Sequence, residues 1–145
     1  MKAMTLSEFA KKLDEMMILI MQKMTAQLTD EFYKLKVTMP QVMVMGFLTR
    51  KGESNMTDLA NSLNVTTAAV TGVIDRLSRD GYVKRVNDPE DRRIVKVKLT
   101  KKGADLINTI RKHRTKMTMS LFSKVSQSDR QEYLRILEGV RAHLE

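Results

Sequence analysis

The first segment suited to ligand contact is a run of small, weakly polar residues near the middle of the chain. If Val70, Ile74 and Leu77 face a core, helical geometry turns the residues between them toward solvent. The candidate contact residues are then Thr66, which caps this helix, together with Thr67, Ala68, Thr71 and Gly72. Such a surface can enter the DNA major groove closely, where threonine hydroxyls bond base edges and methyl groups meet the thymine methyl. Arg76, one turn further on, is better placed to reach a DNA backbone phosphate.

The second segment is a charged turn in which two arginines stand beside three carboxylates. Arg92 and Arg93 follow Asp88, Glu90 and Asp91. A thin, protruding turn fits the DNA minor groove, whose negative potential favours an inserted arginine. We expect Arg93 to enter that groove with its guanidinium oriented by Asp91, and Arg92 to contact the backbone. The alternative is a solvated turn with local ion pairs, each contributing about 0–1 kcal/mol.

The elements that position these two segments follow from apolar spacing and capping signals. Spacings of three and four predict helices, and alternation of apolar with polar residues predicts strands. We expect helices over residues 6–35, 41–48 and 56–63, between Thr66 and Gly81, after Thr100, and from Ser126 or Ser128, with strands over 82–87 and 94–99. Two short helices joined by a turn and followed by a charged hairpin form a winged helix-turn-helix.

The first predicted helix is too long for a chain of this size to cover by itself. At about 1.5 Å per residue it extends roughly 45 Å. The chain has 145 residues, and the apolar stripe of this helix includes Leu6, Phe9, Leu13 and Met16. We therefore expect a second copy of the chain to cover it in a homodimer.

Bulk composition narrows the class of function. The formal net charge is +9, from 26 Lys+Arg against 17 Asp+Glu, which favours a polyanionic partner, either nucleic acid or an acidic membrane surface. The alternative is a soluble protein kept apart from its neighbours by charge. Cysteine is absent, which excludes disulfides, thiolate nucleophiles and Cys-based zinc sites. No apolar run is long enough to span a membrane, and the charged start of the chain makes a poor signal peptide, so we expect a cytoplasmic protein.

Enzymatic activity is not expected. The sequence contains no HExxH motif and no phosphate-binding glycine loop. His113 and His143 are the two histidines, and they lie far apart without an evident His/Glu cluster. We therefore expect no catalytic residues, no cofactor and no metal site.

Residues 59–103, LANSLNVTTAAVTGVIDRLSRDGYVKRVNDPEDRRIVKVKLTKKG, resemble the MarR family of transcription regulators. The DPEDRR turn followed by VKLTKKG is the most specific part of the resemblance, and the flanking helices match the family in length and order. The resemblance implies a mainly α fold with a small β-hairpin wing. Residues 1–145 would form one MarR-type domain, with a winged helix-turn-helix at 40–100 between dimerisation helices at 1–36 and 101–145.

The resemblance also implies a function. Family members are homodimers that place a recognition helix in the major groove and a wing arginine in the minor groove of pseudo-palindromic DNA. By motif the recognition positions fall on Thr67, Ala68, Thr71 and Gly72, and the wing arginine falls on Arg93. Many relatives are repressors that a small phenolic or lipophilic ligand releases from DNA. Gly72 stands where some relatives present a longer side chain, so their base preference does not transfer.

Methionines crowd the first two predicted helices, which in the family help to wall an effector pocket. Flexible, polarisable methionines can repack around varied apolar ligands. We name Met17, Met21, Met43 and Phe47 as the candidate pocket, while plain core or dimer packing is the commoner use of such a stripe. A competing function is that of an architectural protein that coats DNA without sequence preference. The net charge favours that role, and the small, weakly polar recognition surface argues against it.

Overall fold

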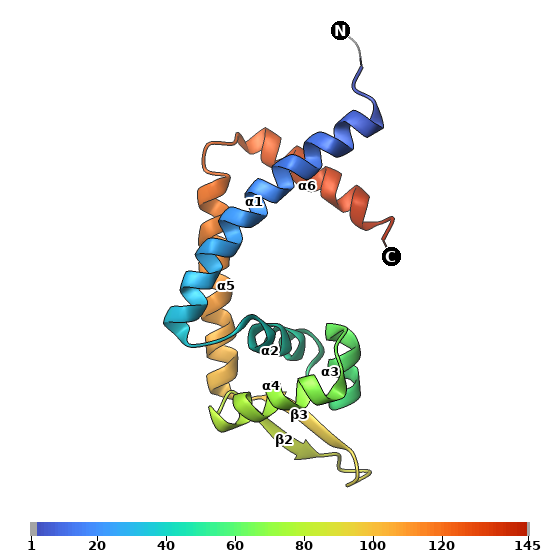
Figure 1. The fold of residues 1–145 in the computed structure, drawn as a ribbon, viewed down its shortest axis with the longest axis vertical. Coiled ribbons are helices and arrows are strands. Elements are labelled where there is room, and N and C mark those ends of the chain that lie inside the picture. Colours follow the sequence, from blue (N-terminus) through green and yellow to red (C-terminus); the bar gives the residue numbers. More distant parts are fainter. Residues whose placement is uncertain (1–2, 145) are drawn as a thin grey trace. The chain divides into compact units, whose positions relative to one another are not determined.

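The structure, a computed structural model, describes residues 3–144 as two compact units. The first unit extends to Arg111 and the second begins at Lys112, so the boundary lies within a helix. The helices and strands, in chain order, are α1 Leu6–Leu35, α2 Met39–Lys51, β1 Ser54–Asn55, α3 Met56–Leu63, α4 Thr67–Arg79, β2 Val83–Asn87, β3 Val95–Leu99, α5 Lys101–Leu121 and α6 Gln127–Arg141 (Figure 1).

Side-chain caps explain where the helices begin. Thr5 and Glu8 form the predicted capping box at the start of α1, and Thr38 and Gln41 form a second one at α2, where Pro40 occupies the first turn. Helix α2 begins two residues before the predicted Gln41, because Thr38 caps a run without obvious periodicity. Ser126 rather than Ser128 caps α6: its hydroxyl accepts a hydrogen bond from the amide of Asp129.

The strands form a three-stranded antiparallel sheet in the order β1-β3-β2. The predicted hairpin pairs Val83 with Leu99 and Asn87 with Val95. The edge strand β1 was not predicted, because two residues are too few to show alternation; Ser54 pairs with Val97. The wing is thus a hairpin with a short third strand along its β3 edge. In Figure 1 the turn between β2 and β3 projects beyond α4.

The core of the first unit lies between α2, α3, α4 and the sheet. Val70, Ile74 and Leu77 are buried, which confirms the predicted inner face of α4. They pack in one cluster with residues from the neighbouring elements: Val44, Met45, Leu48, Leu59, Val83, Val97, Ile107 and Ile110. This core fixes which side of α4 is left to face solvent.

Most of α1 lies outside that core. Phe32, near its C-terminal end, is the buried residue of the helix, whereas Phe9 is 50% exposed and Leu6 is 82% exposed. In the described part of the second unit, α6 has no buried residue, and Leu134 and Val140 are more than half exposed. Apolar helix faces of this length are unusual on an isolated soluble chain.

A tight junction joins the end of α4 to the start of α5. Gly81 has a positive φ of 78°, and its carbonyl accepts a 2.6 Å hydrogen bond from the Thr100 hydroxyl. Lys102 donates a 2.7 Å hydrogen bond to the carbonyl of Asp80 and lies over the ring of Tyr82. Gly103 is buried here, and a Cβ at this position would lie 2.1 Å from the Tyr82 carbonyl oxygen. The orientation of α4 is thereby tied to the first turn of α5.

Candidate nucleic-acid interface

The N-terminal turn of α4 presents the small residues that the sequence singled out. Thr66, Thr67 and Ala68 are exposed, whereas Thr71 and Gly72 are half-buried. A Cβ built at Gly72 meets nothing within 4 Å, so the helix surface stays open at this position. The geometry of the helix thus places its N-cap Thr66 and the four α4 residues on one accessible surface. These four are Thr67, Ala68, Thr71 and Gly72.

Two of the threonine hydroxyls already take part in hydrogen bonds within the helix. Thr66 Oγ1 accepts a 3.1 Å bond from the Ala69 amide, and Thr71 Oγ1 donates a 2.8 Å bond to the Thr67 carbonyl. The Thr71 hydroxyl can therefore accept a hydrogen bond from a base but has no proton to donate. Thr66 keeps its hydroxyl proton. The two residues consequently offer opposite hydrogen-bonding functions to a ligand.

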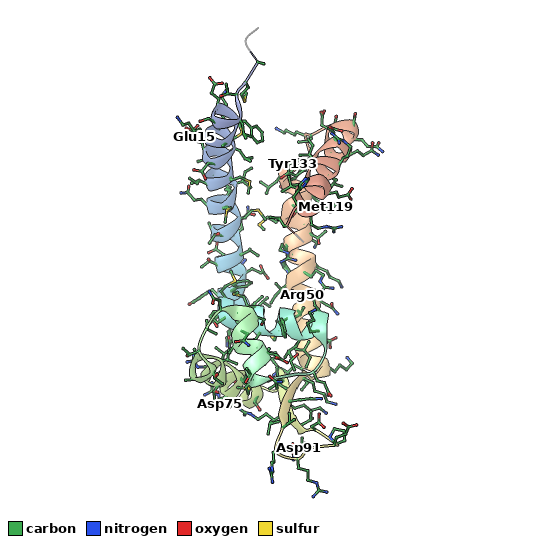
Figure 2. The ribbon with its side chains drawn as sticks, turned by 90° about the vertical axis from the view of Figure 1, so that its right-hand side faces the viewer. Glu15, Arg50, Asp75, Asp91, Met119 and Tyr133 are labelled. Atoms are coloured by element: carbon green, nitrogen blue, oxygen red, sulfur yellow. The ribbon has the colours of Figure 1, made fainter. Side chains whose placement is uncertain are left out.

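An ion pair connects α4 to the wing. Arg85 Nη2 in β2 lies 2.5 Å from Asp75 Oδ1 in α4, and the two side chains are 38% and 60% exposed. Asp75, labelled in Figure 2, was expected to flank the outward face of α4. Its partner lies ten residues away on another element, so helical spacing alone did not reveal the pair. The pair offsets a negative charge beside the proposed contact surface.

The tip of the wing is held by carboxylates that bind its backbone. Asp88 Oδ1 accepts hydrogen bonds from the amides of Glu90, at 2.8 Å, and Asp91, at 3.3 Å. Asp91 Oδ1 in turn accepts a 3.0 Å bond from the amide of Arg93. The Asp91 carboxylate thus holds the main chain of Arg93, and the expected orientation of the guanidinium by Asp91 stays a prediction. Figure 2 shows Asp91 at the end of the hairpin.

Arg92 and Arg93 are both exposed. Within residues 3–144 neither guanidinium has a hydrogen-bond or ion-pair partner, so both charges are available to an external anion. Arg76, also exposed, lies on α4 one turn beyond the small residues. The structure therefore places the predicted residues in two sets on the first unit, one on α4 and one at the wing tip.

Lys96, near the turn end of β3, lies close to two acidic side chains. Its Nζ lies 2.6 Å from Asp88 Oδ2 and 3.8 Å from Glu53 Oε1. The hydrogen bond with Lys96, followed by those from the amides of Glu90 and Asp91, lowers the pKa of Asp88 from its ordinary value. The same hydrogen bond and the Asp88 charge raise the pKa of Lys96. Both groups are therefore charged at neutral pH, and Lys96 is already neutralised within the wing.

The expected effector-pocket residues do not share a described hollow. One hollow, of about 690 Å³, lies between α5 and α6 beside Phe122 and Tyr133, whose ring centroids are 5.5 Å apart. A second, of about 550 Å³, lies along α1 and includes Met21. Met17 and Met43 are exposed, and Phe47 packs partly against the core. The four-residue pocket stays a prediction. Figure 2 labels Tyr133 and Met119, which also lines the first hollow.

Among residues 3–144, no three His, Cys, Asp or Glu side chains gather as a metal site would require. His143 Nδ1 lies 2.7 Å from the carbonyl oxygen of Gly139. Within the same residues, no helix combines the length and the apolar character needed to cross a membrane.

The fold matches solved winged-helix structures over nearly its whole length. A MarR family protein from Bacillus stearothermophilus superposes with a TM-score of 0.87 at 19% identity, covering 97% of this chain and 98% of that one. A point mutant of MepR from S. aureus, solved bound to an oligodeoxyribonucleotide, superposes with a TM-score of 0.71 at 21% identity, covering 92% and 98%. At these identities the likeness shows the fold, and the molecule is a winged helix-turn-helix protein flanked by long helices.

Sequence comparison gives the family. Residues 37–95 match the model of the MarR family, which confirms the resemblance seen in the sequence. The HTH-type transcriptional regulators YfiV and YhbI of Bacillus subtilis are 39% and 35% identical over 89 and 103 residues. These alignments cover 59% and 71% of this chain but only 56% and 66% of the relatives. The transcriptional repressor IacR of Pseudomonas putida is 25% identical over 112 residues, 77% of this chain and 67% of that protein.

Proposed function

We propose that this protein is a sequence-specific DNA-binding transcription regulator. The observation that carries the proposal is the pairing of two exposed features on one winged helix-turn-helix. These are the weakly polar first turn of α4, beginning at Thr67, and the wing-tip guanidinium groups of Arg92 and Arg93, which are unpaired within the described residues. Neither feature is needed by the core, and each suits a different DNA groove.

The two features divide the contact between the grooves. The small residues of α4 let the helix approach base edges in the major groove, where Thr66 donates and Thr71 accepts a hydrogen bond. Arg93 enters the adjacent minor groove, whose narrow A·T-rich form attracts a guanidinium. Arg76 and Arg92 bind phosphates and supply the part of the affinity that depends on salt.

The proposed DNA-binding form is a homodimer on a pseudo-palindromic site. The exposed apolar faces of α1 and α6 support this form, because burial of Phe9, Leu13, Leu134 or Leu137 against a partner removes apolar surface from water. Two copies of α4 then read half-sites whose centres lie about one DNA turn apart, roughly 10 base pairs.

Selection from a random-sequence duplex pool, followed by footprinting, tests the proposal. We expect recovered sites with two inverted half-sites, both protected from cleavage. Recovery of no preferred sequence, with uniform binding along any duplex, would instead identify an architectural protein. A footprint with one unpaired half-site would contradict the dimeric form but not the contact of α4 with the bases.

The proposal includes repression relieved by a small lipophilic or phenolic ligand. IacR is named as a repressor, and the methionines exposed along α1 form an adaptable apolar surface. We expect simple phenols and aromatic carboxylates to raise the melting temperature and to release the selected duplex. Met21→Ala and Met43→Ala should each reduce release while DNA affinity without ligand is unchanged. Equal release from both variants and the wild type would remove the methionines from the ligand site.

A further inference from the structure

Asp88 is the most enclosed carboxylate of the wing turn. Its side chain is 14% exposed, whereas Glu90 and Asp91 lie open to solvent. Both of its oxygens have partners: Oδ1 accepts from the amides of Glu90 and Asp91, and Oδ2 faces Lys96 Nζ at 2.6 Å. One side chain thus joins the two amides of the turn to the opposite strand.

The main chain around Asp88 closes the turn in the same place. The Asp88 amide donates a 2.9 Å hydrogen bond to the Ile94 carbonyl, and the Ile94 amide donates one of 2.9 Å to the Asp91 carbonyl. The Asp91 amide donates a hydrogen bond to the Asp88 carboxylate. The Asp91 carboxylate in turn accepts a hydrogen bond from the Arg93 amide. A continuous set of hydrogen bonds therefore connects Asp88 to the backbone that carries Arg93.

The negative charge of Asp88 is unfavourable for a polyanionic ligand, so its presence in this turn calls for a structural reason. A carboxylate at a DNA-contacting turn repels phosphates, and electrostatics alone predicts that its removal strengthens binding. Lys96, which is also 3.8 Å from Glu53 beside β1, is the cation that compensates for it. A turn built only for attraction would need neither Asp88 nor its partner.

We propose that Asp88 is the positioning residue of the wing: it fixes the turn so that Arg93 is presented to the minor groove. The inference rests on the proposed function, because it assigns the geometry of that DNA contact. Asp88 itself touches no DNA in this mechanism. It acts through the amides of Glu90 and Asp91 and through its ion pair with Lys96.

The first test uses the sign of the effect on affinity. Asp88→Ala and Glu90→Gln each remove one negative charge from the same turn, and no hydrogen bond to the Glu90 carboxylate is present among the described residues. On the duplex recovered from the random pool, we expect Glu90→Gln to bind as tightly as the wild type or tighter. Asp88→Ala should bind about fivefold or more weakly, as loss of one good base contact would.

Two milder variants separate the roles of the two oxygens. Asp88→Asn keeps an oxygen for the turn amides but loses the charge that faces Lys96, and Lys96→Met removes the cation while keeping an apolar stem. We expect both to have intermediate affinity. Circular dichroism and the melting temperature of the free protein identify any variant that fails to fold, in which case these two carry the test.

A double-mutant cycle with Arg93→Ala shows whether the effect passes through that arginine. If Asp88 acts by presenting Arg93, Asp88→Ala causes no further loss of affinity in the Arg93→Ala background. A general loss of structure would weaken binding in both backgrounds equally and would overturn the inference. So would Asp88→Ala binding as well as Glu90→Gln. Failure of the wild type to bind any duplex would instead overturn the proposed function.

Discussion

Asp75 of α4 and Arg85 of β2 are joined by a 2.5 Å ion pair that connects this helix to the wing. Both side chains are more than a third exposed, so the pair contributes little to stability, about 0–1 kcal/mol. Its larger consequence is electrostatic. The pair neutralises the charge of Arg85 and so lowers the net positive charge beside α4.

Asp75→Asn should therefore strengthen DNA binding. The change removes a negative charge and releases Arg85, so we expect higher affinity for random-sequence duplex and a salt dependence steeper by about 0.9 per phosphate gained. Fluorescence anisotropy at several salt concentrations measures both. Glu15→Gln on α1 is the matched charge control and should change neither (Figure 2). Weaker binding by Asp75→Asn would mean that the pair chiefly holds the wing in place.

Arg93→Ala should weaken binding to the selected duplex by about 1–3 kcal/mol, the cost of one good specific contact. The guanidinium is exposed and makes no internal ion pair in the described part of the chain, so folding and dimerisation should be unaffected. Titration of labelled duplex and analytical ultracentrifugation check the two statements. Lys124→Ala, after α5, removes the same charge far along the chain and serves as the control. Unchanged affinity for Arg93→Ala at physiological salt would exclude the wing contact.

Thr71 should contribute through its methyl group and its acceptor oxygen. The hydroxyl proton is bound to the Thr67 carbonyl at 2.8 Å, so it is unavailable to a base. We expect Thr71→Val, which keeps a methyl group and the side-chain shape, to retain preference at a thymine, and Thr71→Ala to lose about 1 kcal/mol or more there. Binding to a panel of single-base variants of the site tests this. An equal loss on every sequence would place Thr71 on the backbone instead.

Gly103→Ala should destabilise the junction between α4 and α5. The added Cβ would meet the Tyr82 carbonyl oxygen at 2.1 Å, and overpacking of this kind costs about 1–3 kcal/mol. Gly72→Ala is the matched control, because nothing lies within 4 Å of its Cβ position; within helix α4 it should stabilise by about 0.5–1 kcal/mol. Denaturant unfolding of both variants gives the comparison. Equal stability of the two would show that the junction readily moves apart.

The contacts that Asp88 makes with Lys96 and with the amides of Glu90 and Asp91, here called the wing clasp, should withstand mild acid. The folded-state pKa of Asp88 lies below its ordinary value of about 3.9, so the clasp is fully present above that pH and is lost as pH falls through the lowered pKa. Lys96 has a raised pKa, so its contribution is lost only at strongly alkaline pH. The charged groups around Asp88 are Lys96 on β3, Glu53, and Glu90 and Asp91 in the same turn. Carboxyl NMR titration should show Asp88 ionising at lower pH than it does in an unfolded peptide of the same sequence; an unshifted midpoint would contradict the clasp.

Local signals in the sequence were sufficient for most of the secondary structure. Thr5 with Glu8, Asn55 and Thr66 each bind an amide of the helix that follows, so the starts of α1, α3 and α4 are encoded within a few residues. The inner face of α4 was equally predictable, because burial of Val70, Ile74 and Leu77 repeats with the helical period. The exposed positions of Thr67 and Ala68 follow from the same geometry.

Contacts between distant residues were decided only by the tertiary structure. Asp75 meets Arg85 because the sheet packs against α4, and Ser54 forms an edge strand because β3 offers it a partner. Asp91 accepts a hydrogen bond from the Arg93 amide, and its own amide is bound by Asp88. Spacing along a chain specifies which face a residue occupies. Which group it meets there depends on elements that the fold brings together from elsewhere.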